Sequence, residues 1–163
     1  MQKSLLFIDT PAGRFGMVEE DEAITQVFFE NEGVLLDARL EETKLLKKAG
    51  QQLQEYFAGR REIFDLPLAP KGTTFQLEVW RALQDIPYGE TRSYKDIAAA
   101  VGNYKASRAV GMANHHNPIA IIIPCHRVIG SNGRLVGYGG GLDVKDYLLN
   151  LEKQYVLMKK NPN

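Results

Sequence analysis

The apolar residues of this chain change their spacing partway along the sequence, and the change predicts two structural parts. The first part begins with three short apolar runs separated by turn signals, which is the pattern of strands. These runs are Leu5–Ile8, Phe15–Val18 and Ile24–Phe29. A helical spacing follows over Glu41–Phe57, and the segment 66–72 then holds two prolines and a glycine, which oppose helix. We therefore predict an α/β fold whose first domain, residues 1–70, is a small sheet with one helix, followed by a mostly helical domain over 71–163.

The second domain carries signals for a helix pair and for a glycine-rich loop. Helices are expected from Thr73 to Ile86, from Ser93 to Val101, from Lys105 to His116 and from Val144 to Leu157. A buried apolar run, Ile119–Ile123, precedes the single cysteine, and we expect it to end as a strand. Residues 130–141 are glycine-rich and predict a short hairpin or wing. The second and third helices, joined by a glycine-containing turn, match the helix-turn-helix pattern, which is a weak signal alone.

Charge is distributed unevenly along a chain whose total is neutral, with 20 basic and 20 acidic residues. Residues 1–70 hold 8 Lys and Arg against 13 Asp and Glu, whereas residues 92–134 hold six basic residues against one acid, Asp96. The six are Arg92, Lys95, Lys105, Arg108, Arg127 and Arg134. A basic stripe of this kind is compatible with a nucleic-acid backbone and also with an ordinary solvated surface.

Cysteine usage and hydropathy limit the kinds of protein that this chain can be. One cysteine forbids an internal disulfide and a multi-cysteine zinc site, so we expect no structural metal. No apolar run is long enough to span a membrane, and the N-terminus lacks the pattern of a signal peptide. These features predict a cytoplasmic protein without a membrane partner.

The neighbours of Cys125 point to a reactive thiol. A lone cysteine is most often an inert buried side chain. Cys125, however, is followed by His126 and Arg127, and a histidine in a positive environment favours the thiolate. Because adjacent side chains diverge, we expect a water between the thiol and His126, and an orienting carboxylate behind the imidazole. Glu152, close to the inward residues of the last helix, is the candidate, although its spacing also fits a solvated helix face.

The residues around Cys125 resemble the active-site signature of the O6-alkylguanine-DNA alkyltransferases, also called methylated-DNA–protein-cysteine methyltransferases. The signature is Pro124-Cys125-His126-Arg127-Val128, and further matches cover roughly residues 73 to 152. They are Asn117-Pro118, Ser93-Tyr94, Arg108-Ala109-Val110-Gly111, Gly137-Tyr138 with the glycines after it, and Leu148-Leu149 with Glu152. The first 70 residues resemble the family only in length, acidic balance and the order of strands before helix.

The resemblance implies a ribonuclease-H-like first domain and a winged helix-turn-helix second domain that binds double-stranded DNA containing O6-alkylguanine. The helix from Lys105 to His116 would lie in the minor groove, where the small residues Ala106, Ser107 and Ala109 allow close approach. Arg108 would fill the gap left when the damaged nucleotide swings out of the stack, although a simple phosphate contact is the alternative. Arg127 is also expected to contact DNA.

The resemblance also assigns roles around the base. Tyr94 would turn the guanine and donate a hydrogen bond to N3, which neutralises charge as the base leaves. The pocket wall would be formed by Tyr138, Gly139 and Gly140, and the guanine amino group would donate to the carbonyls of Cys125 and Val128. Asn117 would support the active site.

The implied reaction is a direct displacement. Cys125 attacks the alkyl carbon, restored guanine departs, and a thioether remains that this sequence has no means to cleave. The protein would therefore act once, as a monomer, without cofactor or obligate protein partner. Activity on O4-alkylthymine, the accepted alkyl size, cooperativity on DNA, inducibility and the contribution of the first domain are left open.

Three other classes of protein compete with this interpretation. A lesion-binding protein without transfer activity would replace Cys125, which is present here. A helix-turn-helix transcription factor would read the major groove with long polar side chains, and the small residues between Lys105 and His116 fit that poorly. A cysteine hydrolase normally brings its cysteine and histidine together from distant segments, not from adjacent positions.

Overall fold

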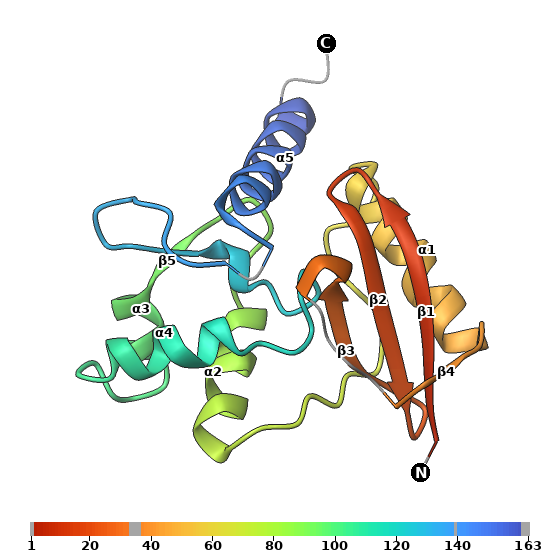
Figure 1. Cartoon of the computed structure of the whole chain (residues 1–163). Helices are drawn as coiled ribbons and strands as arrows, with labels where there is room; N and C mark the ends of the chain where they lie inside the picture. The colour runs from red at the N-terminus through yellow and green to blue at the C-terminus, as the bar shows by residue number, and fades with distance from the viewer. Residues whose placement is uncertain (1, 33–36, 139, 161–163) are drawn as a thin grey trace. The chain divides into compact units, whose positions relative to one another are not determined.

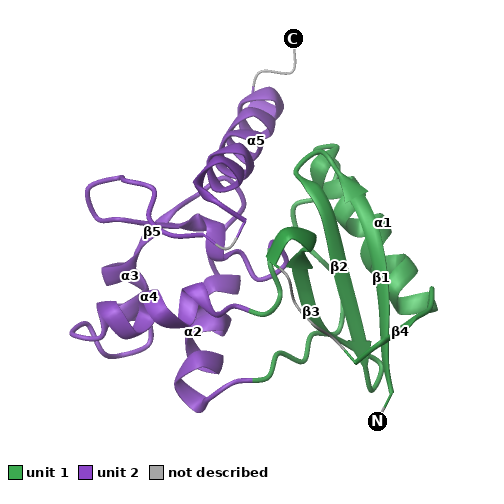
Figure 2. Ribbon diagram, viewed as in Figure 1, with its two compact units in different colours: residues 1–71, 118–120 green, residues 72–117, 121–163 purple. Residues whose placement is uncertain are grey.

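The computed structural model describes residues 2–32, 37–138 and 140–160, which form two compact units (Figures 1 and 2). Unit 1 comprises Met1–Lys71 with Pro118–Ala120, and unit 2 comprises Gly72–Asn117 with Ile121–Asn163. The predicted fold class is confirmed, because unit 1 is a sheet with a helix and unit 2 is mostly helical. The sequence pattern gave no sign that the segment 118–120 lies with the first unit.

Unit 1 is built on a four-stranded sheet in the order β3-β2-β1-β4. Its strands are β1 (Lys3–Thr10), β2 (Gly13–Glu20), β3 (Ala23–Phe29) and β4 (Arg39–Leu40), and a 3-10 helix follows β3 at Glu30–Glu32. The pairs β1–β2 and β2–β3 are antiparallel, joined by two-residue turns, whereas β4 lies parallel to β1. The turn between β2 and β3 places Asp21 and Glu22 at φ values of 52° and 63°, which is the geometry of a tight hairpin turn.

Helix α1 (Lys44–Phe57) lies along one face of this sheet (Figure 1). Thr43 caps it by accepting a hydrogen bond from the N–H of Leu46, and its apolar stripe is buried as the spacing predicts. The buried stripe is Leu46, Ala49, Leu53, Tyr56 and Phe57. Phe15 packs against both Phe29 and Phe57, with ring centroids 4.5 and 6.1 Å away. A second apolar cluster, Leu5 with Val18 and Phe28, completes the core of unit 1.

The outer edge of β3 is covered by two segments of the same unit. Ile24 forms two backbone hydrogen bonds with the segment 66–72. Its carbonyl accepts from the N–H of Ala69, and its N–H donates to the carbonyl of Pro67. Val27 pairs in the same way with the segment 118–120, donating to Pro118 and accepting from Ala120. These pairings satisfy a strand edge that would otherwise present open backbone groups.

Unit 2 begins with three helices, of which the first two start at side-chain caps. Helix α2 (Thr74–Gln84) and helix α3 (Tyr94–Ala100) each open with a capping box, formed by Thr73 with Gln76 and by Ser93 with Asp96. Helix α4 (Ser107–His115) follows a glycine turn and packs on both, with Trp80 Nε1 donating to the carbonyl of Ala113 at 2.8 Å.

The rest of unit 2 carries the cysteine segment and the final helix. Ile119 makes only an isolated bridge, and residues 120–122 form a turn, so the strand expected before Cys125 is absent from this described stretch. The 3-10 helix Cys125–Arg127 leads into β6 (Val128–Ile129), which pairs in parallel with β5 (Arg92–Ser93). Residues 130–138 and 140–141 form a loop with turns and no strand, so of the expected hairpin or wing the hairpin is absent from these residues. Helix α5 (Leu142–Lys160) closes the unit.

Candidate active site around Cys125

Cys125 is held by its own backbone surroundings. The residue is 6% exposed and opens the 3-10 helix. The carbonyl of Ile123 accepts two hydrogen bonds, from the N–H of Cys125 and from Asn117 Nδ2, both at 2.8 Å. The carbonyl of Cys125 accepts from Asn114 Nδ2 at 3.3 Å. Since Asn114 lies on α4 and Asn117 just after it, the end of this helix fixes the backbone on both sides of the thiol.

His126 and Glu152 meet inside unit 2, where both side chains are almost completely buried. Imidazole Nε2 lies 2.6 Å from Glu152 Oε2. Burial lowers the pKa of His126, and the charges of Arg127 and Lys145 act in the same direction, which outweighs the attraction of Glu152. The imidazole is therefore neutral at neutral pH, and its bond to a carboxylate places the proton on Nε2 and the lone pair on Nδ1.

Glu152 is the centre of a dense set of hydrogen bonds. Arg127 Nε donates to Oε1 at 2.9 Å and Arg127 Nη2 to Oε2 at 3.1 Å, and the N–H of Gly89 donates to Oε1 at 3.0 Å. Burial alone would raise the pKa of Glu152, but His126 and the Arg127 guanidinium together hold it far below its usual range. Glu152 is thus an anion throughout the neutral range, and it is no solvated helix-face charge.

The position of Arg127 corrects one sequence-based expectation. Its side chain was expected on DNA, yet the residue is only 5% exposed. Besides Glu152, the guanidinium donates from Nη1 to the carbonyl of Ile86 at 2.8 Å and lies over the ring of Tyr88. These contacts hold the arginine inside unit 2, because the guanidinium already interacts with the carboxylate, the carbonyl and the aromatic ring.

Gly89 was missed as a site residue because the sequence marks it only as the end of a helix. Its φ of 80° lies in the left-handed region, and a Cβ there would come within 2.6 Å of Val156 on α5. Glycine is required for both reasons. The close approach lets its N–H reach Glu152, so the loop after α2 is anchored to α5 at the active carboxylate.

Tyr94 reaches the same region because β5 and β6 pair. Val128 and Ile129 follow the cysteine helix and lie beside Arg92 and Ser93, the residues that lead into Tyr94. Burial raises the pKa of Tyr94, and the charge of Cys125 raises it further. The phenol therefore stays protonated and can act as a donor. Its hydroxyl donates to the carbonyl of Val136 at 3.2 Å.

Lys145 is a second site residue that sequence reasoning missed. Its side chain is fully buried, and Nζ donates at 2.8 Å to the carbonyl of Val136, the same acceptor that Tyr94 uses. Burial lowers the pKa of Lys145 to about 8, while the charge of Cys125 opposes this shift. The same attraction favours the thiolate form of Cys125. The signal in the sequence was its helical spacing, since Lys145 lies one turn before Leu148 on the buried face of α5.

The predicted pocket residues lie on two segments. Val128 is buried, and its N–H donates to the carbonyl of Cys125, which also accepts from Asn114. That carbonyl has both lone pairs engaged, so a guanine amino group would have to displace one donor. Tyr138 is half-buried in the loop, and its carbonyl accepts from the N–H of Gly141 at 2.9 Å. Gly140 is half-buried there too, whereas Gly139 lies outside the described residues.

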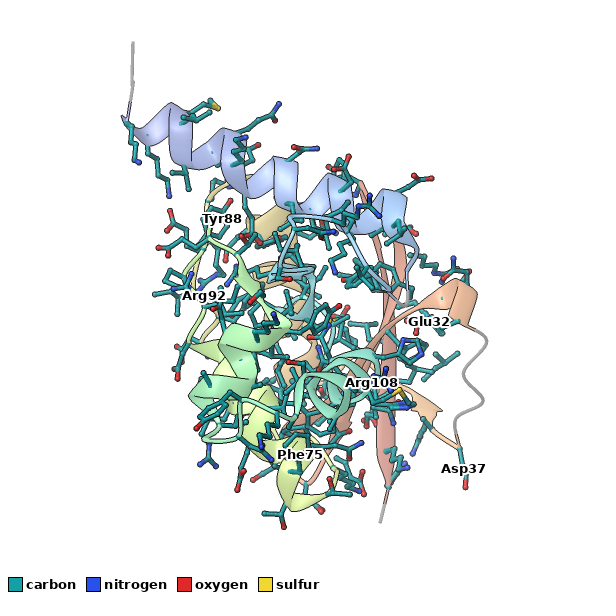
Figure 3. All side chains as sticks on the ribbon, turned by 90° about the vertical axis from the view of Figure 1, so that its left-hand side faces the viewer. Glu32, Asp37, Phe75, Tyr88, Arg92 and Arg108 are labelled. Carbon is teal, nitrogen blue, oxygen red and sulfur yellow. The ribbon has the colours of Figure 1, made fainter. Side chains whose placement is uncertain are left out.

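Apart from Arg127, the predicted DNA-contacting residues are consecutive at the start of α4, where Ala106 is the N-cap. Figure 3 labels Arg108 among them. Arg108 and Ala109 are exposed, and Ala106 and Ser107 are partly exposed. One turn after Arg108, the side chain of Met112 is 59% exposed on the same helix face. The surface of small residues at the start of α4 is therefore followed, one turn along the helix, by a long apolar side chain.

The described residues contain neither a metal-binding cluster nor a membrane-spanning helix. Within 2–32, 37–138 and 140–160, no group of three or more His, Cys, Asp or Glu side chains is arranged to hold a metal ion. None of the helices in these ranges is both long and apolar enough to cross a bilayer.

Known proteins match both parts of the chain. The family description "6-O-methylguanine DNA methyltransferase, DNA binding domain" matches residues 74–154, and the ribonuclease-like domain of the same description matches residues 5–70. A methylated-DNA–protein-cysteine methyltransferase of Methanosarcina acetivorans is 50% identical over 147 residues, which cover 88% of this chain and 94% of the relative. The constitutive enzyme of that name from Bacillus subtilis is 51% identical over 152 residues, covering 89% of this chain and 92% of the relative.

A solved structure has the same fold. The crystal structure of Mycobacterium tuberculosis OGT in complex with DNA superposes with a TM-score of 0.88 at 45% sequence identity. The match covers 93% of this chain and 94% of that one.

Proposed function

Because this chain belongs to the 6-O-methylguanine DNA methyltransferase family, we propose that it repairs DNA by moving an alkyl group from O6 of guanine to its own Cys125. The observation that carries the proposal is the buried chain of contacts behind the single cysteine. His126 is neutral, its Nε2 is bound to Glu152, and Glu152 is kept ionised by Arg127. This is the arrangement that an activated thiol nucleophile needs.

The first step is removal of the thiol proton. It passes from Cys125, through a water molecule, to Nδ1 of His126, and the imidazolium that forms is stabilised by Glu152 at 2.6 Å. The Lys145 ammonium favours the thiolate by charge. The environment thus lowers the cost of forming the nucleophile at neutral pH.

The second step is displacement at the alkyl carbon. A bond forms between Cys125 Sγ and that carbon while the bond from carbon to O6 breaks, and the electron pair of this bond stays on the guanine. The Tyr94 hydroxyl supports the departure of guanine by donating toward the charge that develops on the base. To do so it gives up its bond to the carbonyl of Val136. The thioether product has no route back to a thiol, so each molecule acts once.

The proposed substrate is duplex DNA that contains O6-alkylguanine. The exposed start of α4 supports it, since Ala106, Ser107 and Ala109 leave room for the helix to approach the minor groove. Arg108 is exposed beside them and takes the place of the extruded nucleotide, which makes O6 accessible to the thiol. Tyr138 and Gly140 form the pocket wall, Val128 offers a carbonyl to the base, and Asn117 positions the cysteine segment.

The proposal extends to the state in which the protein works. We propose a monomer in the cytoplasm, where one free cysteine stays reduced, acting without a cofactor or an obligate protein partner.

Substitution of the cysteine tests this proposal. Cys125→Ser should abolish transfer from an O6-methylguanine duplex and still bind that duplex in a gel-shift assay, because α4 is untouched. Asp146→Asn, an exposed change on α5, is the matched control and should transfer at the wild-type rate. Transfer by Cys125→Ser would contradict the assignment of the acceptor. Wild-type protein that binds the lesion without transfer would be a lesion recogniser instead.

A further inference from the structure

A buried isoleucine four residues before the cysteine adopts a backbone conformation that isoleucine avoids. Ile121 has a φ of 68°, in the left-handed region. Among the described residues, the other non-glycine residues with positive φ are Asp21 and Glu22, which lie in a tight surface turn where this geometry is common. Ile121 is β-branched, is 1% exposed and lies outside any hairpin. Left-handed backbone is a true outlier for such a residue.

The conformation carries an energetic cost that the surroundings must offset. For an L-residue the left-handed region is disfavoured by about five- to thirtyfold in population, and β-branching adds to this. Strain of this kind persists only where neighbouring contacts determine the backbone more strongly than the residue does, and it gathers at functional sites.

Contacts on both sides of Ile121 supply that constraint. Before it, the backbone of Ala120 donates to the carbonyl of Val27, and that of Pro118 accepts from Val27. After it, the carbonyl of Ile123 accepts from Asn117 Nδ2 and from the N–H of Cys125. Residues 120–122 between these contacts form a turn, and Ile121 is its central residue and its corner.

We propose that the left-handed backbone of Ile121 is a positioning device that aims Cys125 for attack, an inference that rests on the proposed alkyl transfer. The corner directs Ile123, Pro124 and Cys125 into the 3-10 helix in which the thiol and His126 follow each other. A relaxed φ at residue 121 would move the Ile123 carbonyl away from Asn117 and change the direction of the cysteine backbone. Displacement at carbon needs an aligned thiolate, and a misplacement of about 1 Å can slow an enzyme about a hundredfold.

The choice of isoleucine follows from two requirements on this corner. Glycine would adopt the same φ without strain, but it would also visit many other backbone conformations. Isoleucine adopts it at a cost, and its buried side chain anchors the corner in the core of the unit. Isoleucine at this position thus lowers the folding stability somewhat and fixes the direction of the backbone at Cys125.

Four variants separate positioning from packing. Ile121→Ala and Ile121→Gly remove the same large side chain and differ mainly in the φ that they tolerate. Ile122→Ala and Ile122→Gly are the matched controls, because Ile122 is also an isoleucine, is 7% exposed, and has no positive φ. For each variant we would measure the urea unfolding midpoint, the affinity for an O6-methylguanine duplex, and the rate of transfer at saturating duplex.

The proposal predicts opposite orders of stability at the two positions. At residue 122 the glycine variant should be less stable than the alanine variant, by about two- to fivefold in the unfolding equilibrium constant. At residue 121 the order should reverse, because glycine relieves the strain that alanine keeps. A more stable alanine variant at residue 121 would show that the backbone is not strained and would overturn the proposal.

The rates then test the link to function. Ile121→Gly should transfer at least about tenfold more slowly than Ile121→Ala at saturating duplex, although it is the more stable protein, with duplex affinity unchanged. The two variants at residue 122 should transfer at rates within about twofold of each other. Equal rates for the two variants at residue 121 would show that the strain affects stability and not the transfer step, and would overturn the positioning role. Absence of transfer by the wild-type protein would instead refute the proposed function and would leave the stability order as a separate result.

Discussion

Replacing Glu152 with glutamine removes one negative charge while it keeps the shape of the side chain. In the wild type this carboxylate accepts hydrogen bonds from His126, from two nitrogens of Arg127 and from the backbone of Gly89. The glutamine amide would offer one acceptor oxygen, and its NH2 group would face donors. The Arg127 guanidinium would then be left in a buried site without its counter-charge.

The size of the effect follows from burial. The side chains of Glu152 and Arg127 are 1% and 7% exposed, so water cannot replace the lost charge. Removing one partner of a buried ion pair costs about 3–5 kcal/mol, because the remaining charge is uncompensated. We therefore expect Glu152→Gln to lower the free energy of unfolding of unit 2 by about 4 kcal/mol. That is a large part of the total stability of an ordinary domain, about 5–15 kcal/mol.

The single tryptophan of the chain reports this change. Trp80 is buried in unit 2 and bonded to the carbonyl of Ala113, so its fluorescence follows the unfolding of that unit. With a urea m-value of about 2 kcal/mol per molar, a 4 kcal/mol loss moves the midpoint down by about 2 M. Asp146→Asn, on the same helix and exposed, should shift it by less than about 0.3 M. A loss below about 1 kcal/mol for Glu152→Gln would refute the reasoning that the carboxylate compensates Arg127.

Three further outcomes are expected. Glu22→Gly should stabilise the protein by about 1 kcal/mol, because a left-handed position at φ 63° suits glycine; calorimetry showing a lower melting temperature would contradict this. Arg108→Ala should slow repair of a lesion duplex more than it slows reaction with free O6-benzylguanine, and equal slowing would remove Arg108 from nucleotide extrusion. The folded-state pKa values of His126 and Glu152 lie below their ordinary 6.5 and 4.5, so the unfolded chain binds more protons in acid. Stability should therefore fall from pH 7.5 to pH 5, and a constant urea midpoint over that range would exclude this linkage.

Elements that depend on local signals were predictable from the sequence. The capping residues Thr73 and Ser93 mark the starts of α2 and α3 because each satisfies backbone N–H groups within its own helix. The pairing of His126 with Glu152 could also be anticipated, since the final helix had to bury one face and Glu152 adjoins that face. For residues 130–141 the expectation was a short hairpin or a wing. The described residues 130–138 and 140–141 form turns, as their glycines indicate, and no strands, because they lack the alternating apolar residues that pair strands.

Features that depend on tertiary proximity were not accessible in the same way. Counting charges placed Arg127 in a basic surface stripe, but only the fold reveals that Glu152 and the Ile86 carbonyl enclose it. On α5 the aromatic Tyr147 is 38% exposed, whereas the charged Lys145 is buried. A buried lysine is rare enough that hydrophobic patterning alone would not select it. The left-handed backbone of Ile121 leaves no trace in the sequence.

Intact-mass spectrometry tests the central claim most directly. The protein is incubated with a duplex that carries one O6-methylguanine, and the protein mass and the remaining lesion are followed together. We expect a gain of one methylene group per protein molecule, located by peptide mapping on Cys125, with one lesion consumed for each protein modified. Loss of the lesion with no change in protein mass, or a gain that maps to another residue, would contradict self-alkylating repair by Cys125.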